Sequence, residues 1–414
     1  MMSNIDSFKT HSFLSISDND VNGRMIGVSN ISNVVLTGRN SFYPNVLFLN
    51  IESKQLISPY DEKIMSLNKD SFYDGNVFEF DSSTIKTDNV IEDPVFFFIY
   101  NFDNYYHFLY DTLPYLHSYF EIKKKLPNLK LLINYPNPTR SSFYEFNIDI
   151  LNKIVDFNND LIIHKEGNLY ERVFTSSSLT HGGLSNLPPR CEIYDVYRNM
   201  KNNIIRNPDI LHKKIYISRR TWINGDTSNI GTNYTTRRKM VNEDRLVEEL
   251  TKLGIVEVFT ENLSIDEKIQ LFDQADLIIG SIGGGMSNLL FSEKKTKSIV
   301  IVTPHFLDIN YRFKYSMESS DITYFDKVSV YKEKNEIPLF CRATIKEDEK
   351  IGEIIEYDES TGNYLLNISK NDVAGFNNSI EFNKKWSSID EFDLLDKGLN
   401  SPYQVDIDEL LKII

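Results

Sequence analysis

Four short apolar segments alternate with stretches of helical periodicity between residues 214 and 302, and this pattern constrains the fold more than any other feature of the chain. The segments are Lys214–Ser218, Val256–Phe259, Leu277–Gly280 and Ser298–Val302. Each is short and apolar, as is typical of a buried strand. Strands that alternate with short helices form parallel sheets, so we expect a Rossmann-like α/β domain here.

The helices of this region are marked by their ends. We expect Asn242 to cap the first helix and Gly254 to end it. Ser264 is expected to cap the second helix, whose first turn contains acidic residues that the helix dipole favours. A third helix is expected from Met286 to Ser292, directly after a glycine-rich loop.

A second alternation of strands and helices, in residues 90–185, predicts another α/β unit with a parallel sheet. Strands are expected at 94–100, 130–134 and 161–164, and helices at 104–125 and 141–155. Pro114 lies inside the first of these helices and is expected to kink it or to break it into two pieces. A further helix at about 192–205 is expected to carry the chain across to the second domain.

The length of 414 residues exceeds that of one ordinary hydrophobic core and indicates two domains with a terminal addition. We expect an N-terminal α/β domain at 1–205, a Rossmann-like domain at 206–330 and an acidic C-terminal extension at 331–414 that packs back on the domains. Residues 1–90 are expected to be strand-rich, for example at 45–50 and 77–80, and the extension to form short helices at 388–396 and 407–414.

The net charge of −14 argues against a general binder of nucleic acid or of anionic membranes, because both need a basic surface. Cys191 and Cys341 lack metal-ligand spacing and are expected to be free thiols in a reducing compartment. The chain starts without a signal-like segment, and its most apolar run, Val95–Tyr100, is far shorter than the roughly 20 residues of a membrane span. We therefore expect a cytoplasmic protein without a transmembrane segment, and peripheral membrane association stays open.

A glycine-rich loop, Gly283-Gly284-Gly285, joins the third strand of the second half to the following helix. Glycines let a ligand approach the backbone and leave N–H groups free to bind an anion. Ser287 and Asn288 follow in the first helical turn, where they are placed to face a diphosphate. An ordinary tight turn is the alternative. The loop has neither the Walker A pattern nor G-x-G-x-x-G, which disfavours an ATPase or a dehydrogenase.

An arginine pair, Arg219-Arg220, follows the first strand of the same half, and ligands of open α/β sheets bind beyond the carboxyl ends of strands. Arginine binds diphosphate through bidentate hydrogen bonds, whereas a salt-bridged pair is the structural alternative. Arg237-Arg238 offers a second positive group, and residues 221–236 between the pairs are suited to a loop that closes over a ligand. Glu243 is either a helix-start acid or a ribose contact.

His107 and Asp111 form a third cluster, in the first half of the chain. Positions i and i+4 share one face of a helix, so the imidazole and the carboxylate point the same way. Such a pair can deprotonate a hydroxyl, one group taking the proton while the other orients it. A packed, hydrogen-bonded histidine is the alternative.

Metal chemistry is not indicated, because the second half has no compact Asp-x-Asp and the other histidines are scattered. Basic side chains are therefore expected to neutralise a bound anion. We expect no metal site and no cofactor.

Together these elements resemble glycosyltransferase family 61, over roughly residues 95–305. Residues 104–111 look like the family's His-Phe-x-x-Asp element, and residues 216–220 and 237–243 look like its basic elements. The resemblance continues through residues 264–275 and ends in the loop 280–288.

The resemblance implies a GT-B architecture, with two Rossmann-like domains facing across a cleft. It also implies metal-independent, inverting transfer from a nucleotide sugar, usually a UDP-sugar, to a hydroxyl of a glycan or glycoconjugate, as in surface polysaccharide synthesis. Asp111, or His107 oriented by Asp111, would be the catalytic base at the acceptor side. The residues expected at the donor are Arg219, Arg220, Arg238, Asn242, Glu243, Ser281, Gly283, Gly284, Gly285, Ser287 and Asn288.

One position departs from the family pattern. The family loop usually reads Gly-x-His-Gly, and Ile282 stands at the histidine position. This departure favours the main alternative, a non-catalytic module that binds a nucleotide sugar or glycan on an inactivated transferase fold. A nucleotide-sugar epimerase of the same shape is a further alternative.

Overall fold

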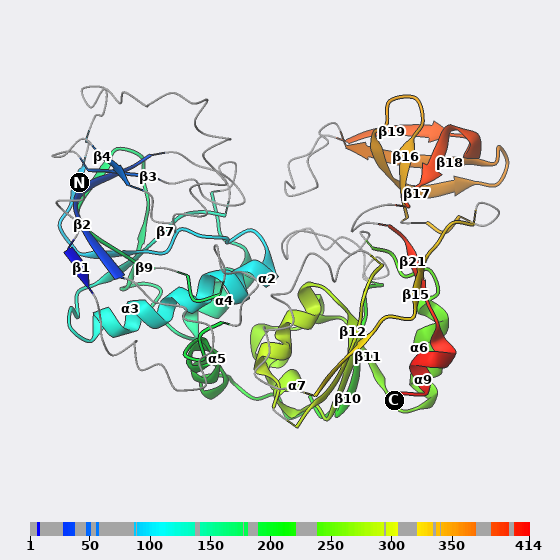
Figure 1. Ribbon diagram of the computed structural model, residues 1–414, viewed down its shortest axis with the longest axis horizontal. Helices are drawn as coiled ribbons and strands as arrows, with labels where there is room; N and C mark the ends of the chain where they lie inside the picture. Colours follow the sequence, from blue (N-terminus) through cyan, green and yellow to red (C-terminus); the bar gives the residue numbers. More distant parts are fainter. Residues whose placement is uncertain are drawn as a thin grey trace. The chain divides into compact units, whose positions relative to one another are not determined.

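The structure is a computed structural model. It describes residues 6–8, 28–37, 47–50, 55–57, 87, 89–136, 141–176, 178–180, 189–220, 238–293, 295–304, 321–333, 337–339, 341–369, 382–396 and 401–414. The described residues divide into two compact units, one ending at Asn203 and the other beginning at Ile204 (Figure 1). Among them, no helix combines the length and the apolar content that crossing a membrane requires.

The first unit is built on a nine-stranded sheet. Its strands are β1 (Asp6–Phe8), β2 (Val28–Thr37), β3 (Leu47–Asn50), β4 (Gln55–Ile57), β5 (Asn89–Ile91), β6 (Val95–Phe97), β7 (Lys130–Ile133), β8 (Leu161–Ile163) and β9 (Asn168–Ser176). The main order is β4-β3-β2-β9-β6-β7-β8, with β1 on β2 and β5 on β9. The parallel part expected from the sequence is confirmed for β6, β7 and β8.

The sheet is mixed, however, because β9 runs parallel to β6 and antiparallel to β2. This strand was not expected, and it joins the strand-rich start of the chain to the α/β part. The strand expected at 77–80 lies outside the described residues.

The helix expected at 104–125 is confirmed as an interrupted one. It begins as α2 (Tyr105–His107), widens into a π-helical turn (Phe108–Thr112), tightens into a 3₁₀ turn (Leu113–Tyr115) and continues as α3 (Leu116–Lys123). Pro114 lies in the 3₁₀ turn, where its missing N–H is tolerated. The other helices of this unit are α4 (Glu145–Asn152) and α5 (Ile193–Asn202).

The second unit contains a five-stranded parallel sheet of β10 (Lys214–Ile217), β11 (Val256–Val258), β12 (Leu277–Ser281), β13 (Lys297–Ile301) and β14 (Ile322–Phe325). The order is β11-β10-β12-β13-β14, so the direction of winding reverses between β10 and β12. The four expected strands are confirmed, and β14 adds a fifth. The α/β class is thus confirmed, whereas the GT-B arrangement stays a prediction.

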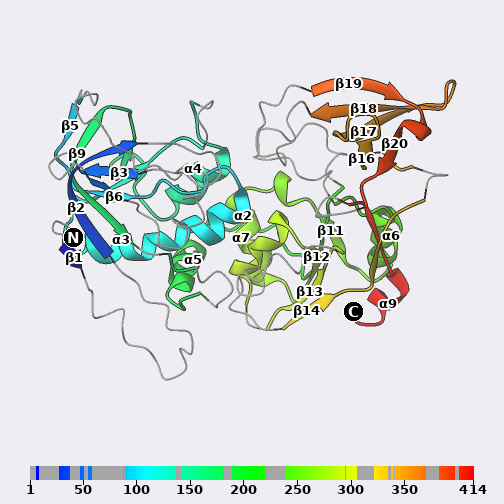
Figure 2. The same cartoon turned by 45° about the horizontal axis from the view of Figure 1, so that its top comes forward.

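Helices cover both faces of this sheet (Figures 1 and 2). α6 (Glu243–Lys252) lies on one face with α9 (Ile407–Leu411), and α7 (Ile265–Gln274) lies on the other. The expected ends are confirmed at Gly254, whose φ is +71°, and at Ser264, which forms a capping box with Glu267. The third helix differs from the expectation, since it is a 3₁₀ helix that begins two residues earlier and spans Gly284–Phe291.

Residues after β14 form a separate antiparallel sheet rather than short helices. Its strands are β16 (Arg342–Ile345), β17 (Ile351–Asp358), β18 (Asn363–Ser369), β19 (Phe382–Ser387) and β20 (Phe392–Leu394), in the order β19-β18-β17-β16-β20. The helix expected at 388–396 was wrong: the capping box at Ser388 starts only the 3₁₀ turn Ile389–Glu391, which leads directly into β20. The sheet has its own small core, which includes Ala343, Ile354 and Leu366.

This antiparallel sheet is an insertion between two paired strands. β15 (Val328–Val330) leads into it and β21 (Tyr403–Val405) leaves it, and the two pair antiparallel (Figure 1). After β21 the chain returns to the second unit, where Ile407 and Leu410 of α9 join the same core cluster as Leu246 and Leu250 of α6. The helix expected at 407–414 is therefore confirmed, and it completes the core of the parallel sheet.

Candidate functional site

The candidate site lies where β10 and β12 end, at the reversal of strand order. In an open α/β sheet this is the place where ligands bind, because the connections diverge on either side and leave the strand ends open. Strand pairing aligns Ile217 with Gly280, and the chains continue into Ser218–Arg220 and Ile282–Gly285. The sequence prediction of Arg219 and the glycine loop at one edge is confirmed in position.

Each glycine of the loop meets different surroundings. A Cβ built on Gly283 would lie 2.7 Å from Nη1 of Arg219 and 3.8 Å from Nη2 of Arg238. A Cβ on Gly285 would lie 2.9 Å from Cγ2 of Ile217, whereas one on Gly284 would have no atom of the described residues within 4 Å. Gly285 is thus needed for packing and Gly283 for the approach of the arginines, while Gly284 has open space beside it as far as the described residues extend.

Arg219 is held at this position by its backbone. Its amide donates a hydrogen bond of 2.8 Å to Oε1 of Glu243, the first residue of α6. Arg238 reaches the same loop from a backbone with φ of +59°, a conformation that is costly for a residue other than glycine. Two guanidinium groups therefore converge on Gly283, next to the open space above Gly284.

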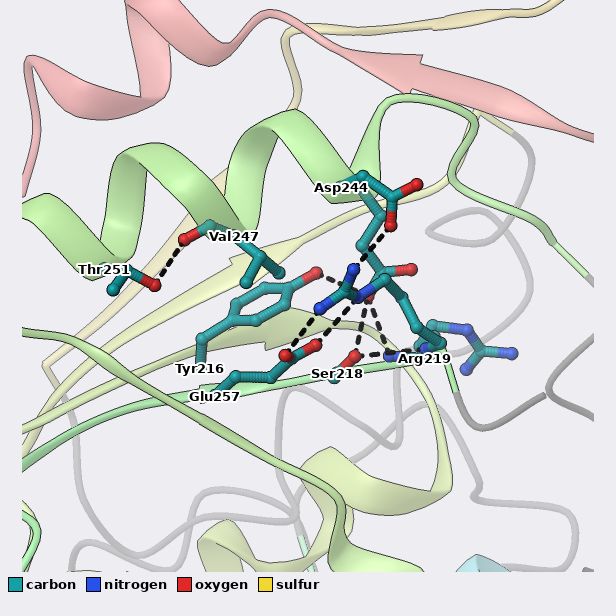
Figure 3. Close-up of polar contacts among 9 residues, drawn as sticks. Tyr216, Ser218, Arg219, Asp244, Val247, Thr251 and Glu257 are labelled. Carbon is teal, nitrogen blue, oxygen red and sulfur yellow. Dashed lines mark hydrogen bonds and ion pairs between the residues drawn. The ribbon is translucent and has the colours of Figure 1, made fainter. Parts of the chain in front are cut away.

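Arg220 points to different partners. Its guanidinium makes two hydrogen bonds to Glu257, Nε to Oε1 at 2.9 Å and Nη2 to Oε2 at 2.6 Å, and a third to Asp244 (Figure 3). These carboxylates hold the pKa of Arg220 well above its usual value. This is the salt-bridged alternative of the sequence analysis, so phosphate binding by Arg220 stays a prediction that would require breaking the network.

Glu243 is buried, with a relative exposure of 1%. Its Oε1 accepts hydrogen bonds from the Tyr216 hydroxyl at 2.8 Å and the Arg219 amide, which Figure 3 shows converging from the end of β10. Burial raises the pKa of Glu243, and the bonds from the Arg219 amide and Tyr216 act against this. The carboxylate thus orients the strand end that presents Arg219.

The other polar residues expected at the donor are bonded within the protein. Asn242 occupies the N-cap position without a capping bond; instead its side chain bonds the backbone N–H and C=O of Val405. The capping prediction was therefore wrong in its mechanism. Ser287 and Asn288 are buried, and their side chains donate to the carbonyls of Gly284 and Gly285. They shape the loop from beneath, so direct contact with a diphosphate stays a prediction.

Ile282, at the position of the family histidine, is fully buried, and its amide donates to the Ile301 carbonyl at 2.9 Å. In this chain position 282 therefore belongs to the core.

Two residues near the loop were missed by the sequence analysis. Tyr403 of β21 places its hydroxyl 2.8 Å from Oγ of Ser281, although the two are 122 residues apart. Glu261 follows β11 in the 3₁₀ turn Thr260–Asn262, and Thr260 approaches Gly285. No local pattern could identify Tyr403, whereas an acid just beyond a strand end is a recognisable signal for Glu261.

The His107–Asp111 pair is confirmed as a contact within the first unit. Nδ1 of His107 lies 2.5 Å from Oδ2 of Asp111, and the side chain of Asp111 is only 6% exposed. The His107 amide donates to Oδ1 of Asn104, which caps α2. Asp111 lies in the π-helical turn, a feature often found at functional sites. The pair has the geometry in which a carboxylate orients an imidazole for proton transfer.

Within the described ranges, no group of three or more His, Cys, Asp or Glu side chains is placed to hold a metal ion. The two cysteines form no disulfide, with Cys191 exposed and Cys341 buried.

Both clusters fall inside a region with a family assignment. Residues 105–299 match the family model described as Glycosyltransferase 61, and this region contains His107, Asp111, Arg219 and the glycine loop. No curated protein gives a significant match to the chain. The chain is therefore similar to the glycosyltransferase 61 family over residues 105–299.

Proposed function

We propose that the chain transfers a sugar from a nucleotide-sugar donor to a hydroxyl group of a glycan or glycoconjugate. The match to the glycosyltransferase 61 family model supports a glycosyltransferase in general terms. A UDP-linked donor, inversion at the anomeric carbon, independence from a metal ion, the GT-B arrangement, a cytoplasmic location and a role in surface polysaccharide synthesis are finer proposals, which rest on the family resemblance.

The observation that supports the donor site best is the position of Arg219 over Gly283, with Arg238 beside it. A diphosphate needs bidentate positive donors and a backbone that it can approach closely, and both occur here beside the open space above Gly284. In transfer the bond from the anomeric carbon to the diphosphate breaks, and negative charge grows on the leaving oxygen. Guanidinium groups held at that position stabilise this charge.

The acceptor hydroxyl must lose a proton as it attacks the anomeric carbon. We assign this step to the His107–Asp111 pair, with Asp111 as the base or His107 as the base that Asp111 orients. Tyr110 and Tyr197 nearby have pKa values raised by burial, so they remain protonated and do not compete as bases.

Calorimetric titration with UDP tests the donor site. Arg219→Ala is expected to weaken UDP binding at least tenfold, because a charge-assisted bidentate contact contributes about 1.5–3 kcal/mol. Arg245→Ala on α6 is the matched control, since its side chain is 65% exposed and lies 3.8 Å from Asp408. Equal UDP affinity in wild type and Arg219→Ala would remove Arg219 from the site.

Release of UDP from a panel of UDP-sugars separates the proposed enzyme from the alternatives. A transferase releases UDP, faster when an acceptor glycan is present. A non-catalytic binding module releases none. An epimerase converts the donor without any acceptor.

A further inference from the structure

Glu261 lies at the same strand edge as the arginines and the glycine loop. β11 pairs with β10, and the Ser218 amide donates to the Val258 carbonyl at 2.9 Å just before the chain turns at Thr260–Asn262. Oγ1 of Thr260 would lie 3.1 Å from a Cβ on Gly285. The turn that holds Glu261 therefore packs against Gly285, the last glycine of the loop.

The carboxylate of Glu261 has an unused acceptor. Its Oε1 is buried and has no hydrogen-bond partner among the residues that the structure describes. Burial raises the pKa of Glu261, while its own amide and the charges of Lys268 and Arg219 lower it. A buried acceptor without a donor costs free energy, so such a group at the edge of a site indicates a missing partner.

Glu243 is the other acid near this edge, and it is enclosed. It is only 1% exposed and already accepts bonds from Tyr216 and Arg219, so a ligand cannot reach it. Glu261 as a residue is partly exposed, although its Oε1 is buried. Of the two roles left open for Glu243, the helix-start acid that orders the strand end fits the structure, and the ribose contact fits Glu261 better.

We infer that Glu261 accepts hydrogen bonds from the ribose hydroxyls of the donor nucleotide. This rests on the proposed function, which places the diphosphate at Arg219 and Gly283. Ribose offers two neighbouring O–H donors, and a carboxylate can accept both. In dinucleotide-binding folds an acid near the phosphate loop accepts the ribose hydroxyl in the same way.

The test compares nucleotides that differ only in these hydroxyls. UDP and 2′,3′-dideoxy-UDP are titrated into wild type, Glu261→Ala and Glu261→Gln, with Glu248→Gln as the control on the exposed face of α6. Wild type is expected to bind UDP about tenfold more tightly than the dideoxy nucleotide. Glu261→Ala is expected to lose this preference by weakening UDP alone, and Glu261→Gln to keep part of it through its amide oxygen.

Three results would overturn the inference, and they differ in what they say about the proposed function. If wild type binds UDP and Glu261→Ala keeps the tenfold preference, Glu261 does not contact ribose while the donor site stands. If neither UDP nor GDP binds wild type, the proposed function itself fails and the inference falls with it. A uniform loss of affinity for both UDP and the dideoxy nucleotide in Glu261→Ala, together with a lower melting temperature, would show a structural role only and would also refute the ribose contact.

Discussion

The hydroxyl of Tyr403 lies 2.8 Å from Oγ of Ser281, and this contact joins the last strand of the chain to the strand that enters the glycine loop. Both residues are buried. The Tyr403 amide also donates to the Lys239 carbonyl, and the Tyr403 carbonyl accepts from the Val241 amide. Burial raises the pKa of Tyr403 to about 12, although Arg219 and Arg238 lower it. Tyr403 is therefore a neutral phenol beneath the two arginines at neutral pH.

Tyr403→Phe is expected to loosen the loop without removing any ligand contact. The Ser281 hydroxyl would lose this buried partner, at a cost of about 1–2 kcal/mol in the free energy of unfolding. UDP affinity is expected to fall a few-fold, since Arg219 and Gly283 lose their fixed spacing. Denaturation and calorimetry measure both effects. Tyr357→Phe, at a residue 44% exposed, is the control. Unchanged values in Tyr403→Phe would show that the contact does not support the loop.

The three loop glycines are expected to respond differently to alanine. Gly285→Ala would press on Ile217 in the core and is expected to lower the free energy of unfolding by about 1–3 kcal/mol. Gly283→Ala would displace the flexible end of Arg219, so UDP affinity is expected to fall about tenfold while the fold survives. Gly284→Ala has space and is expected to leave the free energy of unfolding unchanged. A stability loss in Gly284→Ala that matches Gly285→Ala would contradict this division.

Asp111→Asn is expected to abolish transfer while UDP binding survives, because Asp111 and the arginine cluster belong to different units. Loss of a general base lowers turnover by about 10²–10⁴-fold. Sugar transfer and UDP titration are measured on the same preparation. Asp160→Asn removes a carboxylate of the same unit that pairs with Lys123 at 2.8 Å, and it controls for lost charge. Near-normal turnover in Asp111→Asn would mean that another group takes the proton.

Glu243→Gln is expected to change how stability depends on pH. Burial raises the pKa of Glu243 in the folded state above its usual value of 4.5, so the folded state holds this proton longer than the unfolded state. Stability from this group is therefore present below pH 4.5 and is lost as the pH rises through the raised folded pKa.

The measurement is the free energy of unfolding of wild type and Glu243→Gln from pH 4 to 8. Glutamine keeps an oxygen for Tyr216 and the Arg219 amide and does not titrate. The free energy of unfolding of Glu243→Gln should therefore rise relative to that of wild type as the pH rises. A difference between the two proteins that is constant over this range would show that Glu243 does not titrate with a raised pKa.

Sequence reasoning succeeded where the cause is local. The strands of the parallel sheet are short apolar runs, and the Ser264–Glu267 capping box needs only residues three apart, so both could be predicted. The same motif at Ser388 led to a wrong prediction, because a capping box starts a helical turn but does not set the length of the helix. Here the turn ends after Glu391, where β20 begins to pair with β16.

The roles of individual site residues depended on distant partners. Arg219 and Arg220 are equivalent in the sequence, and only the positions of Glu257 and Asp244 show that Arg220 is tied down. Asn242 bonds Val405 instead of its own helix. The contact of Asn242 with Val405, like that of Tyr403 with Ser281, joins segments more than a hundred residues apart, and the partners of Arg220 lie 24 and 37 residues away. None of these contacts leaves a local pattern.

Two deletions, one of the insertion between β15 and β21 and one of the C-terminal segment, are expected to differ sharply in their effect on stability. The Tyr331 amide donates to the Pro402 carbonyl at 2.9 Å, so an Asn-Gly turn in place of residues 332–401 would close the two strands as a hairpin. The core of the parallel sheet has no member in the removed sheet, and we expect this variant to fold and to bind UDP within a few-fold of wild type.

Ending the chain at residue 400 removes far fewer residues and is expected to do more damage. It deletes Tyr403, Ile407 and Leu410, which are at most 3% exposed and belong to that core. Losing several large buried side chains costs several times the roughly 2–5 kcal/mol of one such truncation, which is comparable to the stability of a domain. Melting curves of the two variants decide the matter: a stable truncated chain, or an unfolded hairpin variant, would contradict this assignment of the C-terminal segment to the donor-binding unit.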